Sequence, residues 1–86
     1  MSQFKNAIEI QKWLLIWLST ELEFDVSNID IQEPFVNFGL SSRQAMVLMG
    51  DLQEYLGITL EDILVWEYPN IQQLSEYLAD QTEQLS

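Results

Sequence analysis

Residues 34–46, from Pro34 to Met46, read PFVNFGLSSRQAM and mark the boundary between two kinds of sequence. Before this stretch turn-forming residues are frequent and no helical period is present, whereas after it apolar residues recur at helical spacing. Ser41 or Ser42 is a suitable N-cap, because a serine hydroxyl can accept a hydrogen bond from an unpaired amide of the first helical turn. The stretch therefore predicts a long loop that ends where a helix begins.

The helix that follows this boundary is expected at residues 42–56. Its apolar side chains recur at spacings of three and four and predict one buried face, made of Ala45, Leu48, Met49, Leu52 and Leu56. Gly57 follows as a left-handed C-cap. Gly50 lies mid-helix, where glycine costs about 1 kcal/mol relative to alanine. Either a close approach by another group or a neutral choice explains that glycine.

A first helix is expected at residues 4–22, which contain neither Gly nor Pro, with Ser2 available as its cap. One apolar stripe is expected to face the core and consists of Ile8, Leu14, Leu15, Leu18 and Leu22. A second stripe beside it consists of Ile10, Trp13 and Trp17. Burial of both stripes is the interpretation we favour, and an exposed aromatic patch for docking or self-association is the alternative.

The loop between these two helices covers residues 23–40 and is long for so small a domain. Loops of this length are commonly functional. Its apolar residues are expected to pin it to the core, and they are Val26, Ile29, Phe35 and Phe38.

The C-terminal part predicts a short helix at residues 61–66, which Pro69 ends, and a last helix at residues 71–81. Asn70 and Gln73 have the spacing of a capping box. The inward side chains of the last helix are expected to be Ile71, Leu74, Tyr77 and Leu78, and the polar tail from Asp80 onward is expected to fray. The chain thus predicts an all-α fold: one domain over residues 1–86, a four-helix bundle with a long loop between helices 1 and 2 and a short third helix.

The charge and composition exclude several functions. Fourteen acidic and three basic residues give a formal net charge of −11, which disfavours nucleic-acid ligands and favours basic partner surfaces. The chain has no Cys and no His, so a disulfide, a protein thiolate and a Ser-His-Asp triad are ruled out, and we expect no metal site and no enzyme. Glu21 and Glu23, or Glu61 and Asp62, are surface acids that imply no hydrolase pocket. The longest apolar run, residues 13–18, is too short to span a bilayer, and we expect a cytoplasmic protein.

The order of these motifs resembles the acyl carrier proteins of the polyketide-synthase type. In that family a helix opens with a fixed order of residues: an aromatic or aliphatic residue, Gly, any residue, Asp, Ser, Leu. The corresponding residues here run from Phe38 to Arg43. Ile29-Asp30 precedes Pro34-Phe35 as in the family, and Leu48 and Leu52 match its helix. The turn from Trp66 to Ile71 (WEYPNI) is similar to that of polyketide-type carriers.

The resemblance implies a covalent 4'-phosphopantetheine arm on Ser42, with Ser41 as the second choice. Ser41 stands at the position of the family's Asp and Arg43 at that of its Leu, and both departures bear on recognition by the transferase. A serine at a helix start suits a phosphodiester, because unpaired amides and the helix dipole stabilise anions there. Attachment of the arm would make the chain a phosphoprotein. The thiol at the end of the arm would supply the thioester chemistry that a chain without cysteine lacks.

The resemblance also implies docking to partners through the face of the second helix opposite the core. The candidate docking residues are Arg43, Val47, Gly50, Asp51 and Glu54, although a solvated surface explains the acids equally well. The implied partners are a phosphopantetheinyl transferase, an acyl-loading ligase or acyltransferase, and synthase enzymes of polyketide, fatty-acid or related lipid biosynthesis. We expect a monomer, and Met1 followed directly by a helix favours a free-standing protein.

Two alternatives remain open. One is a peptidyl carrier of a nonribosomal peptide pathway, although Leu40 stands where such carriers have a second Gly. The other is an unmodified helical protein-interaction domain, which the departures at Ser41 and Arg43 would fit.

Overall fold

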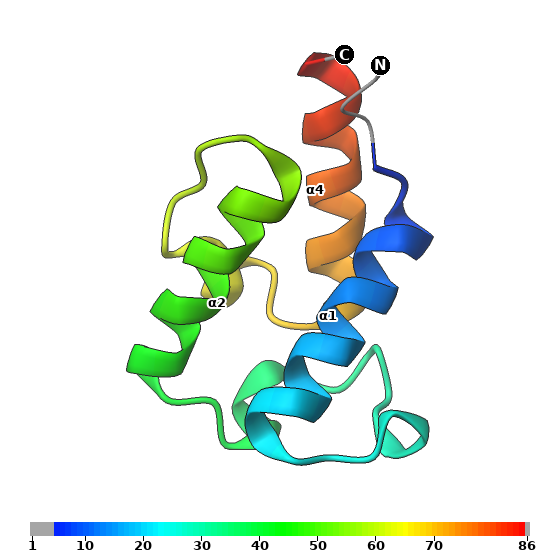
Figure 1. Ribbon diagram of the computed structural model, residues 1–86, viewed down its shortest axis with the longest axis vertical. Coiled ribbons are helices and arrows are strands. Elements are labelled where there is room, and N and C mark those ends of the chain that lie inside the picture. Colours follow the sequence, from blue (N-terminus) through cyan, green and yellow to red (C-terminus); the bar gives the residue numbers. More distant parts are fainter. Residues whose placement is uncertain (1–4, 86) are drawn as a thin grey trace.

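The computed structural model describes residues 5–85 and is a bundle of helices (Figure 1). Its elements are α1 (Ala7–Leu22), the 3-10 turns η1 (Val26–Asn28) and η2 (Phe35–Phe38), α2 (Ser42–Leu56), α3 (Leu64–Glu67) and α4 (Ile71–Leu85). Within residues 5–85 there is no strand, and a single bridge pairs Pro34 with Asn70. The predicted all-α bundle, with its long loop and short third helix, is confirmed.

α1 packs along α4. In Figure 1, α2 stands to the left of this pair, and the long loop crosses the end of the bundle that lies at the bottom of the view. The start of α2 lies at that looped end. At the opposite end, Lys5 and Thr82 meet: the Thr82 hydroxyl donates to the Lys5 carbonyl at 3.2 Å. The N-terminus of α2 is thus presented away from the paired ends of α1 and α4.

The helix bounds agree with the prediction for α2 and differ for the others. α1 begins at Ala7, because Asn6 forms a capping box with Glu9; the predicted cap Ser2 and residue 4 lie outside the described residues. α3 begins at Leu64 instead of residue 61, since the Gln53 side chain accepts a hydrogen bond from the Leu60 amide at 3.0 Å and holds that segment as a loop.

The predicted fraying after Asp80 is wrong, since α4 continues to Leu85. Thr82 is 1% exposed, and its hydroxyl bonds to the Lys5 and Ala79 carbonyls. Contact with the N-terminal residues therefore supports a turn that looks polar in sequence. At the start of α4, the Asn70 side chain accepts from the Gln73 amide at 2.7 Å, as one half of the predicted capping box.

The core takes residues from every helix, and the face predicted for α2 is buried in full. Ile71, Leu74 and Leu78 are buried as predicted, while Tyr77 is half-buried. For α1 the prediction is partly wrong, because Ile8 is exposed and Leu15 and Leu22 are half-buried. The α1 residues that are buried combine the two stripes, and they are Ile10, Leu14, Trp17 and Leu18.

The long loop is pinned to the core mainly through Phe35, which is 1% exposed. The Phe35 amide donates to the Pro69 carbonyl at 2.8 Å, and the Gln72 amide donates to the Ile31 carbonyl at 3.0 Å. These bonds fix the loop against the start of α4. Ile29 and Phe38 are half-buried, whereas Val26, predicted to pin the loop, is 43% exposed on a turn that projects outward.

Among the described helices, none combines the length and the apolar character needed to cross a membrane.

Candidate functional site

The junction at the start of α2 is set by the local sequence. Gly39 has φ 77°, in the left-handed region that glycine adopts without strain, and this turns the chain out of η2. Leu40 is buried and anchors the chain next to the turn. Ser41 then caps α2: its hydroxyl accepts from the Gln44 amide at 3.1 Å, and the Gln44 side chain accepts from the Ser41 amide at 3.0 Å. This capping box defines Ser42 as the first residue of the helix.

The two adjacent serines are therefore in different situations. The Ser41 hydroxyl is engaged in the capping box, whereas the Ser42 side chain is exposed and has no hydrogen-bond partner among residues 5–85. Ser42 is thus the hydroxyl of this junction that is free to react without loss of the cap.

The electrostatics of the junction suit an anion. The first turn of α2 contains no acidic residue, and Arg43 follows Ser42 directly. The amides of the first helical turn and the helix dipole add positive potential at the same point. In a chain of net charge −11, this helix start is a local site at which a phosphodiester would be stabilised.

The residues predicted to dock partners are only partly a free surface. Arg43, Val47 and Glu54 are exposed on α2, and Val47 is 46% exposed. A Cβ added to Gly50 would meet nothing within 4 Å, so the close approach considered for this glycine does not occur among residues 5–85. Asp51 is half-buried and accepts a hydrogen bond from Nε1 of Trp17 at 2.8 Å.

The Trp17–Asp51 bond was not predicted from the sequence. The signal was present, because a tryptophan buried on a helix needs an acceptor for its indole N–H. The choice of Asp51 among fourteen acids depends on how α1 and α2 are paired, and that pairing follows from the tertiary fold. A second link between the same helices is the stack of Trp13 on Tyr55, with ring centroids 5.0 Å apart.

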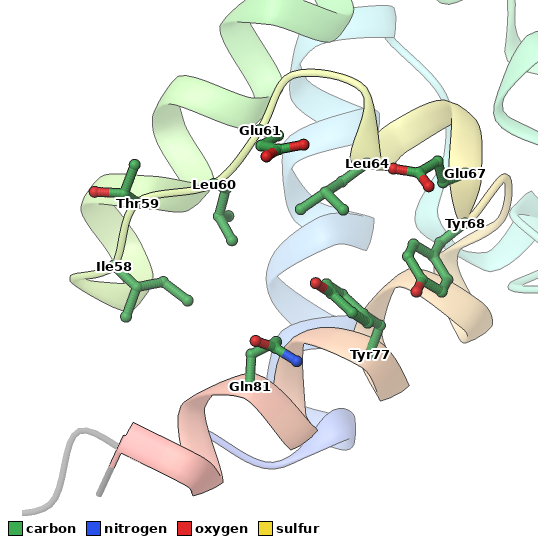
Figure 2. A pocket seen from close by; sticks show the side chains of 9 residues that line it. All are labelled: Ile58, Thr59, Leu60, Glu61, Leu64, Glu67, Tyr68, Tyr77 and Gln81. Atoms are coloured by element: carbon green, nitrogen blue, oxygen red, sulfur yellow. The ribbon is translucent and has the colours of Figure 1, made fainter.

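A hollow of about 370 Å³ lies between the α2–α3 loop, α3 and α4 (Figure 2). Leu60 and Leu64 face Tyr77 across it, and Tyr77 stacks on Tyr68 with centroids 4.3 Å apart. Burial raises the pKa of the Tyr77 phenol, and Tyr68 and nearby carboxylates add to the shift. Ser42 is not among the residues that line the hollow: it begins α2, whereas Ile58 and Thr59 follow the end of that helix.

Away from the helix start, two further groups titrate abnormally. Hydrogen bonds from the Ser27 amide and hydroxyl lower the pKa of Asp25 and hold the η1 turn. Burial, with the charge of Glu9, raises the pKa of Tyr55. Neither group lies at the start of α2. No cluster of three or more potential metal-ligating side chains occurs within the described part of the chain.

Comparison with known proteins gives matches across most of the chain. Residues 12–78 match the family described as "Phosphopantetheine attachment site". The acyl carrier protein TtuC of Teredinibacter turnerae is 33% identical over 74 residues, which cover 86% of this chain and 85% of that protein. A phenolphthiocerol/phthiocerol polyketide synthase chain of Mycobacterium tuberculosis is 38% identical over 71 residues, which are 83% of this chain but only 4% of that much longer protein.

Solved structures give the same picture. An acyl carrier protein from Anabaena with a variant phosphopantetheinylation-site sequence is 35% identical and superposes with a TM-score of 0.83, covering 90% of this chain and 88% of that one. A free-standing peptidyl carrier protein from Acinetobacter baumannii is 29% identical, also with a TM-score of 0.83, covering 88% and 95%. The chain therefore belongs to the phosphopantetheine attachment site family, whose non-catalytic carrier domains bear covalently attached 4'-phosphopantetheine.

Proposed function

We propose that Ser42 bears the phosphopantetheine arm and that this chain, as one domain over residues 1–86, carries acyl intermediates as thioesters between partner enzymes. The observation that carries this proposal is that the two serines at the start of α2 have different environments. Ser41 caps the helix, while the exposed Ser42 hydroxyl has no bond to the described protein. Modification of Ser42 leaves the capping box intact, whereas modification of Ser41 would break it.

The helix start also fits the phosphodiester that would be formed there. First-turn amides provide donors at this end of the helix, and Arg43, the next residue, adds a positive charge to the same turn. The arm ends in a thiol, and because the chain has no cysteine this would be the thiol that forms the thioester with the acyl group. The protein then contributes position and exposure, and the arm contributes the reactive atom.

The class of cargo is proposed from the similarity to acyl carrier and polyketide synthase sequences. We propose polyketide-type acyl intermediates, with fatty-acid or related lipid intermediates as the neighbouring case. The similarity to a peptidyl carrier structure keeps an aminoacyl or peptidyl cargo as a second candidate. The proposed partners are a phosphopantetheinyl transferase, an acyl-loading ligase or acyltransferase, and synthase enzymes.

The test is intact-protein mass spectrometry after incubation with coenzyme A and a broad-specificity phosphopantetheinyl transferase. Wild type should gain the mass of one phosphopantetheinyl group. The Ser41→Ala variant should gain it as well, and the Ser42→Ala variant should not. Modification of Ser42→Ala but not of Ser41→Ala would move the site to Ser41. An unmodified wild-type protein would favour the interaction-domain alternative. The mass of the acyl group on protein isolated from its native host then separates polyketide from aminoacyl cargo.

A further inference from the structure

A groove of about 240 Å³ runs between α1 and α2, and it shares no lining residue with the hollow beside Tyr68 and Tyr77. The side chains that line it are Trp13, Ile16, Trp17, Thr20, Glu21 and Asp51. Of these six residues, only Asp51 belongs to the docking face that the sequence predicts. We refer to this feature as the tryptophan groove.

The groove exists because α1 and α2 are joined by large side chains and not by close backbone packing. α1 packs closely along α4, while its links to α2 are the Trp13–Tyr55 stack and the Trp17–Asp51 hydrogen bond. Two indole rings that bridge separated helices leave a recess between the helix backbones. Trp13 and Trp17 line this recess, and each is held by a contact with a residue of α2.

One edge of the groove is an exposed apolar side chain. Ile16 is 62% exposed, although it belongs to a helix whose neighbouring residues Trp17 and Leu18 are buried. Val47, one turn before Asp51 on α2, is 46% exposed and continues the apolar surface toward Ser42. An aromatic lining beside an exposed isoleucine can bury an apolar side chain from another molecule.

The charge around the groove indicates which kind of partner molecule would bind there. Glu21 and Asp51 line it and Glu54 lies one turn beyond Asp51. Asp51 accepts a bond from a neutral indole and has no ion pair with any residue between 5 and 85, so its negative charge is unpaired within that part of the chain. Lys12, one turn before Ile16, is the cation nearest in sequence to the lining residues. A second copy of a chain with net charge −11 is disfavoured by repulsion, and a cationic partner is favoured.

We propose that the tryptophan groove is a docking site for a partner protein that inserts one apolar side chain, flanked by Lys or Arg, between α1 and α2. Asp51 follows Ser42 by nine residues, about 14 Å of helix, so a partner anchored here would lie close to the serine. The docking face thus extends from α2 onto α1. Identifying the partner as an enzyme that acts on the carrier rests on the proposed function, but the surface itself does not require the arm.

The test uses the indole N–H signals of the ¹⁵N-labelled Ser42→Ala protein, which keeps the groove and cannot be modified at the proposed site. The probe is a synthetic amphipathic helical peptide with a leucine face flanked by arginines. The Trp13 and Trp17 indole signals should move on addition of the peptide. The Trp66 signal, from an exposed residue on α3 that does not line the groove, should stay in place. A matched peptide with alanine in place of leucine, and one with glutamate in place of arginine, should leave all three signals unchanged.

Two pairs of variants sharpen the test. Ile16→Ala should weaken peptide binding about fivefold, because it removes apolar contact area, while Ile8→Ala, similarly exposed on the same helix but outside the groove, should not. Asp51→Asn keeps an oxygen acceptor for Trp17 and should weaken binding about threefold at low salt, whereas Glu76→Gln on α4 should not.

Several outcomes would overturn the proposal. One is equal movement of all three indole signals, and another is no movement at all. If the alanine peptide bound as tightly as the leucine peptide, binding would not depend on an apolar side chain. Movement of the Trp13 and Trp17 signals with protein concentration alone would assign the groove to a second copy. Failure of Ser42 modification in the mass assay would leave these results unaffected, so the two proposals fail separately.

Discussion

Phe35 is the residue whose loss should most directly test how the long loop is held. Its ring is 1% exposed, and its amide donates to the Pro69 carbonyl at 2.8 Å, so it joins the loop to the segment before α4. Phe35→Ala removes a buried ring and leaves a cavity, which costs about 3–5 kcal/mol in typical cores. A domain of 86 residues has a total stability of roughly 4–13 kcal/mol, so the variant should lose a large part of it.

The assay is urea unfolding followed by tryptophan fluorescence, since the chain has three tryptophans, two of them on α1. The midpoint should fall sharply with little change in slope, because the surface exposed on unfolding is nearly the same. The matched control is Val36→Ala: Val36 is the next residue, 61% exposed, and its loss should change the stability by less than about 0.5 kcal/mol. A loss below about 1 kcal/mol for Phe35→Ala would refute the view that this ring pins the loop to the core.

Three further changes test local features. Gly50→Ala should raise the free energy of unfolding by up to about 1 kcal/mol in the same assay, because the helix gains propensity and the new methyl group meets nothing within 4 Å; a loss would indicate an unrecognised contact. Glu23→Gly should leave the free energy of unfolding unchanged or raise it by about 1 kcal/mol, since Glu23 ends α1 with φ 60°, where a side chain is strained. A clear loss of stability would show that the Glu23 carboxylate contributes more than the relief of backbone strain. Burial, with neighbouring Tyr68 and carboxylates, raises the pKa of Tyr77 above 10.0. The contribution of this residue to the free energy of unfolding is therefore fully present below about pH 10 and is lost as the pH rises through the folded-state pKa. Tyr77→Phe should therefore show a smaller fall of the urea midpoint between neutral and strongly alkaline pH than wild type, and an unchanged fall would contradict this.

The order of the helices could be predicted from the sequence because each has a local signal. The bounds of α2 follow from a serine cap at one end and Gly57 at the other, and its buried face has a regular period. The start of α1 could not be placed in the same way, since Ser2 and Asn6 are both good caps by residue type. In the structure the Asn6 side chain accepts from the Glu9 amide and the Glu9 side chain accepts from the Asn6 amide, so Asn6 is the cap of α1.

The face of α1 was harder to predict because apolar residues occur on several of its sides. Ile8 and Ile10 are two residues apart, which on a helix places them on different sides, and the polar residues around them do not mark a single outward face. The packing of α1 on α4 buries Ile10 and leaves Ile8 exposed. Thr82 poses the opposite problem, since it is a polar side chain near a chain end that is nevertheless buried, where it bonds to Lys5.

The family resemblance assigns the arm to Ser42, which stays a prediction, whereas the local sequence left open which of the two serines caps α2. Sequence alone allows either hydroxyl to cap α2, and the family's Asp is absent at Ser41. The structure places the capping box on Ser41 and Gln44, so the neutral hydroxyl does what a carboxylate would do for the amide at the third helical position. It does so without adding a negative charge next to Ser42.

That difference in charge has a consequence for recognition. A carboxylate at Ser41 would repel the phosphodiester proposed for Ser42, whereas a hydroxyl at Ser41 and a guanidinium at Arg43 make the start of α2 less negative. A transferase that approaches acidic carrier surfaces with its own basic residues would gain less attraction at this point, and would instead depend on acids farther along the face, such as Asp51 and Glu54. At this variant junction, the rate of modification should thus be limited by the encounter with the transferase. It should not be limited by the stability of the modified protein. Raising the ionic strength should therefore slow modification of wild type less than it slows modification of Ser41→Asp, and equal salt dependence in the mass assay would show that position 41 contributes no steering.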